Sequence, residues 1–169
     1  MLALFFIGSF LCISLDQLTK YFALSTLKDG GSIEIIKGVF QLNYCENRGA
    51  AFGLLQNQIW LFAIITVIII GAVIFFMISK KPENKLLIIS LTLLTGGALG
   101  NFIDRIFRGF VIDFLDFCLI NFPIFNVADC FVVIGAILLG AYILFFSPDF
   151  PPDKGKEALS EKDDAMQEE

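Results

Sequence analysis

The chain has 169 residues, of which 57% are hydrophobic and 17% are charged, and its net charge is −5. Water-soluble domains carry about 25% charged residues, so this composition excludes an ordinary soluble domain and favours a protein embedded in lipid. The acids concentrate after Pro148 and the rest of the chain is near neutral, which excludes a basic surface for nucleic acid.

Four apolar segments are long enough to cross a bilayer, which takes about 20 residues of helix. They predict transmembrane helices at about 1–24, 59–79, 86–103 and 127–146. The first segment lacks a basic start and a small-residue cleavage site, so we expect a retained helix rather than a signal peptide. The expected fold is therefore an all-α membrane protein, a bundle of four transmembrane helices. We expect one domain over residues 1–147 and a disordered acidic tail over 148–169.

Two longer loops connect these helices. Residues 25–58 contain two β-rich runs, 33–36 and 39–44, and the second alternates apolar with more polar side chains as a half-buried strand does. They predict a small β-sheet at the membrane surface. Residues 104–126 are rich in phenylalanine and broken by Pro123, which predicts an interfacial segment.

The short connection at residues 80–85 sets the expected orientation. It holds three lysines in six residues, and short basic loops stay in the cytoplasm. Four crossings place both termini on the same side as this connection. We therefore expect cytoplasmic termini, with the loops at 25–58 and 104–126 on the extracytoplasmic face.

The residue types limit the possible chemistry. The sequence has no histidine, which excludes Ser-His-Asp and Cys-His catalysis and any histidine-ligated metal. The four cysteines have the spacing of neither a disulfide framework nor a zinc site. We expect no metal and no cofactor, so carboxylates and lysines are the available acid-base groups. The cysteines are Cys12, Cys45, Cys118 and Cys130.

Five acids lie near the expected membrane, where a charge at a helix centre costs about 2.5–3.5 kcal/mol on insertion scales. Asp16 and Lys20 are four residues apart on a predicted helix, and a structural ion pair explains them at least as well as catalysis does. Asp104 and Arg105 close the third helix after a glycine-rich run that is typical of helix packing. The five acids are Asp16, Asp104, Asp113, Asp116 and Asp129.

Asp113 and Asp129 form the most informative pair. Asp113 lies in an apolar run, and desolvation there would raise its pKa above the usual value of about 3.9. Asp129 begins the fourth helix, where a capping role is the simpler interpretation for an isolated acid. On one membrane face, however, two acids can share a proton, so that one activates water and the other polarises a peptide carbonyl. The sequence does not establish that they meet.

The run at residues 47–53 precedes the second helix and consists mostly of small residues. It is interpreted either as a tight entry turn or as room for an extended substrate backbone, beside the Asn47 amide.

Five motifs occur in order at the edges of the predicted helices: DQLTK at 16–20, NRGAAF at 47–52, GGALGNFIDR at 96–105, VIDF at 111–114 and FNVAD at 125–129. With them the chain resembles lipoprotein signal peptidase, the type II signal peptidase of bacteria, from Asp16 to about Phe146. Two departures are Gly53, where the family commonly has serine, and Cys130, where a small residue such as serine is more usual.

The resemblance implies a membrane aspartyl endopeptidase that cleaves a prolipoprotein signal peptide just before its diacylglyceryl-modified cysteine. Asp113 and Asp129 would be the catalytic pair. The other residues that it implies in substrate binding or support are Asp16, Lys20, Asn47, Gly49, Asn101, Asp104, Arg105 and Asn126.

The resemblance also implies where the protein is located in the cell and which molecules it binds. The site would face the outside of the bacterial cytoplasmic membrane, among membrane lipids. Globomycin-type inhibitors would block it, and neither a metal nor a nucleic acid is implied. We expect the chain to be monomeric.

Two other functions remain open at this point. A small proton- or ion-coupled transporter with a relay of Asp16, Asp113 and Asp129 predicts acids deep in the bilayer and an internal repeat. No repeat is visible, and these acids fall at predicted helix ends. A non-catalytic scaffold associating through the glycine-rich third helix leaves the outer-face acids and asparagines unexplained.

Overall fold

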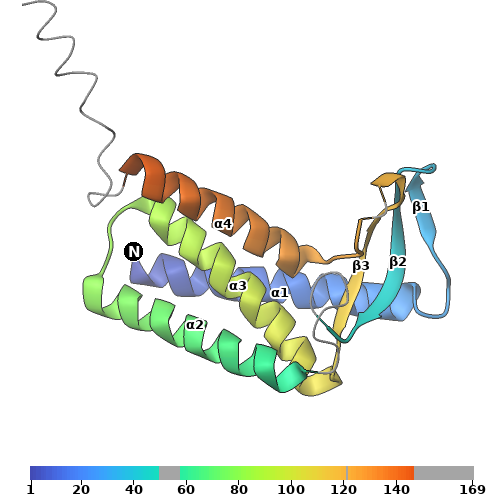
Figure 1. The fold of residues 1–169 in the computed structure, drawn as a ribbon, viewed down its shortest axis with the longest axis horizontal. Helices are drawn as coiled ribbons and strands as arrows, with labels where there is room; N and C mark the ends of the chain where they lie inside the picture. The colour runs from blue at the N-terminus through green and yellow to red at the C-terminus, as the bar shows by residue number, and fades with distance from the viewer. Residues whose placement is uncertain (50–57, 121, 147–169) are drawn as a thin grey trace, which may run out of the picture.

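Four long helices lie side by side in one bundle (Figure 1). The structure is a computed structural model that describes residues 1–49, 58–120 and 122–146. All four helices have the length and hydropathy to cross a membrane, which confirms the expected bundle. They are α1 (Leu2–Thr26), α2 (Ile59–Lys80), α3 (Lys85–Arg108) and α4 (Val127–Phe146).

Helix α3 is the centre of the bundle. In its apolar span 56% of the residues are buried, against 11% to 17% in the other three helices. Asn84 is the N-cap of this helix, and its side-chain oxygen accepts hydrogen bonds from the backbone N–H groups of Leu86 and Leu87 at 2.9 and 3.2 Å. It packs against α1, α2 and α4, so its position decides where the other helices lie.

Glycines on α3 allow α1 and α4 to approach its backbone closely. A Cβ atom on Gly97 would collide with the carbonyl oxygen of Ala128 and would lie 2.9 Å from Val132 Cγ2. A Cβ atom on Gly100 would collide with the carboxylate of Asp16. These contacts support the packing interpretation of the glycine-rich run.

The end of α3 lies five residues beyond the expected boundary at residue 103, at Arg108. Gly109, with φ of 78°, adopts the left-handed conformation that ends the helix. The apolar run stops at the charged residue Asp104, so a boundary predicted from hydropathy falls before the true end of the helix. Asp104 and Arg105 therefore lie on the last turns of α3, and not in a loop.

A three-stranded antiparallel sheet has the order β1-β2-β3. Its strands are β1 (Ile33–Ile36), β2 (Phe40–Asn47) and β3 (Val111–Phe117), followed by the short 3-10 helix η2 (Cys118–Ile120). The first two strands match the two predicted β-rich runs. The third falls in the loop at 104–126, where an interfacial segment without a strand was expected. Pairing with β2 makes it a strand, with Cys45 opposite Asp113 and Asn47 opposite Val111.

The sheet lies across one end of the bundle, where α1 and α3 end and α2 and α4 begin (Figure 1). Ile112 and Phe114 of β3 pack with Ala23 and Leu27, which holds the sheet against α1. Met1 and the connection between α2 and α3 lie at the opposite end. This arrangement places the start of α1 and the end of α4 at the end of the bundle opposite the sheet.

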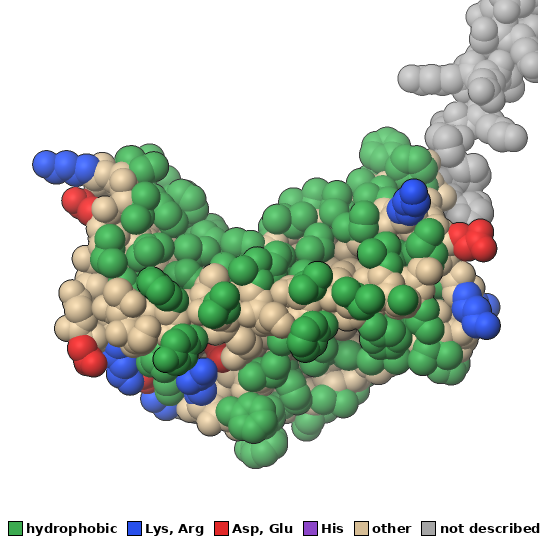
Figure 2. Space-filling view, turned by 180° about the vertical axis from the view of Figure 1, so that it is seen from behind, with side chains coloured by type: hydrophobic (Ala, Val, Ile, Leu, Met, Phe, Trp, Pro, Cys, Tyr) green, Lys and Arg blue, Asp and Glu red, His purple; other side chains and the backbone are tan. Residues whose placement is uncertain are grey.

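The outside of the bundle is apolar, as lipid requires. Large side chains such as Phe10 and Trp60 are 67% and 75% exposed, and hydrophobic atoms cover much of the helical surface in Figure 2. The run at 50–53 and the acidic tail at 148–169 lie outside the described residues, so the predictions made for them stay untested.

We predict that Gly97→Ala destabilises the folded bundle by about 1–3 kcal/mol, because the new methyl group must displace the α4 backbone. Gly140→Ala is the matched control, since a Cβ atom placed there has no described atom within 4 Å apart from its own stretch of helix. Thermal unfolding in detergent should show a lowered Tm for Gly97→Ala alone. Equal Tm values for the two variants would contradict the close approach of α3 and α4.

Candidate active site

Asp113 projects from the middle of β3 into a polar pocket. Its neighbours Ile112 and Phe114 pack with residues of α1, and alternation along a strand therefore directs Asp113 to the other face. The side chain is 1% exposed. Asn47 Nδ2 donates a hydrogen bond to Asp113 Oδ2 at 2.9 Å, and Asn126 Nδ2 donates to Oδ1 at 2.6 Å.

Asp129 lies in the first turn of α4 and exchanges hydrogen bonds with Asn126. The Asn126 backbone N–H donates to Asp129 Oδ2 at 3.1 Å, and the Asp129 N–H donates to Asn126 Oδ1 at 3.0 Å. The capping interpretation is thus confirmed. The second oxygen, Oδ1, accepts a hydrogen bond from Asn101 Nδ2 at 2.7 Å. Asp129 therefore both stabilises the start of α4 and lines the cavity.

The two aspartates line one cavity of about 1070 Å³. Asn126 contacts both of them, so the pair that the sequence left unconnected is brought together. Polar residues line the side of the cavity next to the ends of β2 and α3, whereas α4 and the segment after β3 provide apolar walls. In Figure 2 the molecular surface is hollowed between the sheet end and the helices. The apolar lining includes Phe117, Ile120, Phe122, Phe125, Val133 and Ile134.

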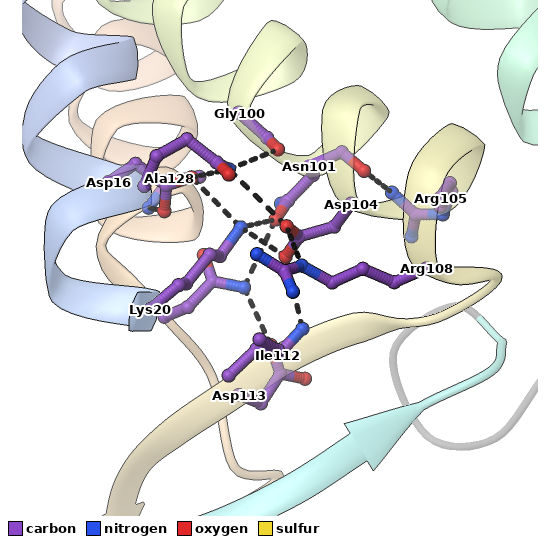
Figure 3. Close-up of polar contacts among 12 residues, drawn as sticks. Asp16, Lys20, Gly100, Asn101, Asp104, Arg105, Arg108, Ile112, Asp113 and Ala128 are labelled. Atoms are coloured by element: carbon purple, nitrogen blue, oxygen red, sulfur yellow. Dashed lines mark hydrogen bonds and ion pairs between the residues drawn. The ribbon is translucent and has the colours of Figure 1, made fainter. Parts of the chain in front are cut away.

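A buried ionic cluster lies beside this pocket (Figure 3). Lys20 Nζ is 2.9 Å from Asp16 Oδ2 and 3.1 Å from Asp104 Oδ2, and all three side chains are 0% exposed. The predicted Asp16–Lys20 ion pair is confirmed, with Asp104 as a second partner. Asp16 lies ten residues before the end of α1 at Thr26, about 15 Å along the helix, so its predicted place at a helix end was wrong.

Arg105 and Gly49 meet at the cavity wall. Arg105 Nη2 donates to the carbonyl oxygen of Gly49 and Nη1 to that of Asn101, each at 3.4 Å. Its guanidinium also lies 5.0 Å from the centre of the Phe62 ring. The arrangement puts a positive charge in the same cavity lining as Asp113 and Asp129.

Asp116, the fifth acid, is not part of the cavity lining formed by the described residues. Gln41 Nε2 and Asn43 Nδ2 donate to its Oδ2 at 2.7 and 3.2 Å. These hydrogen bonds satisfy the buried carboxylate of Asp116, so its role is structural, within the sheet.

Gln17 is a residue of the site that the sequence did not identify. Its Nε2 donates to Asp16 Oδ2 at 3.1 Å, to the Gly100 carbonyl oxygen at 3.1 Å and to Asp104 Oδ1 at 3.3 Å. Its position inside the DQLTK motif was the available signal. The apolar wall of the cavity also gave no local signal, because phenylalanine and isoleucine are common throughout this chain.

Burial and, as the second cause, the nearby charge of Asp129 together raise the pKa of Asp113 from its usual value to about 7. The hydrogen bonds from Asn47 and Asn126 oppose this rise. Asp113 can therefore hold or release a proton near neutral pH, as a general acid or base requires. Among the described residues, no group of three or more acidic or cysteine side chains is arranged to hold a metal ion.

The sequence profile described as signal peptidase (SPase) II matches residues 9–145. The chain belongs to this family. The lipoprotein signal peptidase of Caldanaerobacter subterraneus subsp. tengcongensis is 50% identical over 134 residues, which cover 79% of this chain and 90% of that protein. The lipoprotein signal peptidase of Clostridioides difficile is 47% identical over 138 residues, with 80% and 91% covered.

Solved structures give the same relationship. A bacterial membrane enzyme determined at 2.3 Å by the in meso method has a TM-score of 0.78 and 38% identity, over 84% of this chain and 88% of that one. A second, at 1.9 Å, has a TM-score of 0.77 and 37% identity, over 86% and 95%. These relationships favour a signal peptidase over the transporter and scaffold alternatives.

We predict that Asp113 stays protonated up to about pH 7 and ionises above it, because its pKa is raised to about 7. Infrared difference spectroscopy should show a protonated carboxyl band that disappears across this range and is missing in Asp113→Asn. In Asp129→Asn the midpoint should move to lower pH, because one of the two causes of the rise is removed. An unchanged midpoint in Asp129→Asn would contradict the electrostatic coupling of the two acids.

Proposed function

We propose that Asp113 and Asp129 are the catalytic pair of a membrane aspartyl endopeptidase that removes signal peptides from prolipoproteins. Membership of the signal peptidase II family makes cleavage of lipoprotein signal peptides the activity of this chain. One observation supports the residue assignment above all. Two carboxylates from different elements line the same cavity and share Asn126, and the raised pKa of Asp113 is suited to proton transfer.

We assign the two acids different roles. Asp129 takes a proton from water, whose oxygen then attacks the carbonyl carbon of the scissile bond. Asp113 enters protonated and donates to the carbonyl oxygen as it gains charge, which its raised pKa favours below about pH 7. Collapse of the tetrahedral intermediate breaks the C–N bond, and the leaving nitrogen takes the proton that Asp129 received. The hydroxyl group that becomes the new carbonyl returns its proton to Asp113. The products are a carboxyl group and a free amine.

The remaining cavity residues fit supporting roles. Asn47 and Asn126 hold the carboxyl group of Asp113, and Asn101 holds that of Asp129. Arg105 stabilises negative charge that develops during the reaction. The Gly49 carbonyl oxygen helps to fix the Arg105 guanidinium.

The apolar wall suits a substrate that is itself apolar. A signal peptide is a hydrophobic helix and the modified cysteine carries a diacylglyceryl group, so both partition into lipid beside the cavity. The scissile bond just before that cysteine then reaches the acids at the membrane surface. Globomycin-type inhibitors would occupy the same cavity, and membrane lipids would surround a monomeric enzyme.

We predict that Asp113→Asn and Asp129→Asn each lower cleavage by about 10²–10⁴-fold or more, because each removes a proton-transfer group. The assay incubates purified protein with a diacylglyceryl-modified prolipoprotein and resolves the products on a gel. Asp29→Asn is the control, since Asp29 is exposed and outside the cavity lining. Thermal unfolding should show that all three variants are folded. Full cleavage by either catalytic variant would refute the assignment.

We also propose that the termini and the connection between α2 and α3 are cytoplasmic, with the sheet and cavity outside. Lys80, Lys81 and Lys85 lie at the end opposite the sheet, as the preference of basic loops for the cytoplasm requires.

This orientation predicts the behaviour of carboxyl-terminal fusions in bacterial cells. A green fluorescent protein fused after Glu169 should fluoresce, whereas alkaline phosphatase at the same position should be inactive because it folds only outside the cytoplasm. The opposite pair of results would invert the proposed topology without affecting the assignment of the catalytic acids.

A further inference from the structure

The buried ionic cluster holds the backbone next to each catalytic aspartate. Asp104 Oδ2 accepts a hydrogen bond from the backbone N–H of Ile112 at 3.1 Å. Asp16 Oδ1 accepts one from the backbone N–H of Ala128 at 3.0 Å. Ile112 and Ala128 are the residues directly before Asp113 and Asp129. Each carboxylate of the cluster therefore binds the chain one residue away from one catalytic acid (Figure 3).

Lys20 joins these two carboxylates. Its Nζ lies 2.9 Å from Asp16 Oδ2 and 3.1 Å from Asp104 Oδ2, which come from different helices. Two like charges this close repel strongly in a medium of low dielectric, and the three side chains are fully buried. The lysine cation is what lets Asp16 and Asp104 remain side by side as hydrogen-bond acceptors.

Lys20 is also connected to Asp129, through the side chain of Asn101. Lys20 Nζ donates to Asn101 Oδ1 at 2.8 Å. An ammonium group can only donate, so the oxygen of Asn101 must face Lys20 and its Nδ2 must face away. That Nδ2 donates to Asp129 Oδ1 at 2.7 Å. Asn126 Nδ2 donates to the same Asn101 oxygen at 3.1 Å. Lys20 and Asn126 together therefore orient the amide that donates to Asp129.

We propose that Lys20 is a positioning residue, which sets the separation and orientation of Asp113 and Asp129 through Asp104, Asp16 and Asn101. The inference rests on the proposed function and adds a role to an ion pair that helix packing alone could explain. Lys20 lies outside the cavity lining formed by the described residues, so it acts on the reacting groups and leaves substrate contacts unchanged.

A charge-balanced double variant separates positioning from charge neutralisation. Lys20→Met with Asp16→Asn removes one positive and one negative charge, and Asp104 keeps its 3.2 Å contact with Arg108 Nε. We expect a folded enzyme with kcat lowered about a hundredfold and KM unchanged, because a displacement of about 1 Å in catalytic groups has an effect of this size. Lys37→Met, at an exposed lysine, is the control and should retain wild-type kcat.

A second variant covers the case in which the double variant does not fold. Asn101→Leu keeps the ion pairs of Lys20 with Asp16 and Asp104 but cuts the link to Asp129. It should also lower kcat, which is the readout for this variant because Asn101 itself lines the cavity. Thermal unfolding in detergent shows which variants are folded.

The outcomes distinguish the two proposals. A folded double variant with wild-type kcat, or Asn101→Leu with wild-type kcat, overturns the positioning role while cleavage by the wild type upholds the proposed function. A wild-type chain that leaves the prolipoprotein whole overturns the proposed function, and the positioning role falls with it. Lowered kcat in both folded variants, with a constant KM in the double variant, supports both.

Discussion

The fold is organised around the buried charge of Lys20, which is too costly to place in a membrane without a partner of opposite charge. Lys20 lies fully buried in a membrane-spanning helix, where an unpaired ammonium group is costly, so it must find carboxylates nearby. Asp16 provides one from the same helix and Asp104 provides the other from α3. Asp104 Oδ2 and Asp16 Oδ1 also accept hydrogen bonds from backbone N–H groups at the starts of β3 and α4. Pairing one cation therefore ties together four elements that are distant in sequence.

The packing of α3 makes this cluster possible. Gly97 and Gly100 present bare backbone to α4 and to Asp16, so the helices come close enough for short polar contacts. The exterior remains apolar because lipid is its solvent, and the buried charged side chains lie on the sheet and in the halves of α1 and α3 nearest to it. A hydrolytic site needs water, and the end of a bundle at the membrane surface is where water and a lipid-anchored substrate can meet.

The two acids of the cavity differ in their surroundings, as acid-base catalysis requires. Asp113 is buried on a strand, and desolvation raises its pKa to about 7. Asp129 begins a helix and accepts hydrogen bonds from the Asn126 backbone and the Asn101 side chain, which are favourable to a carboxylate. A single fold thus surrounds chemically identical side chains with different burial and different hydrogen-bond partners.

The sequence alone determined the four helices, the first two strands and the candidate acids, because hydropathy, strand alternation and motifs are local properties. Its motifs indicated the family, and the resemblance implied several polar residues of the cavity lining, including Asn47, Asn101 and Arg105. Tertiary structure alone decided that β3 pairs with β2, that Asp116 belongs to the sheet, and that Gln17 and Asp104 join Lys20. These outcomes depend on contacts between residues tens of positions apart, and a local pattern carries no information about which distant partner a side chain meets.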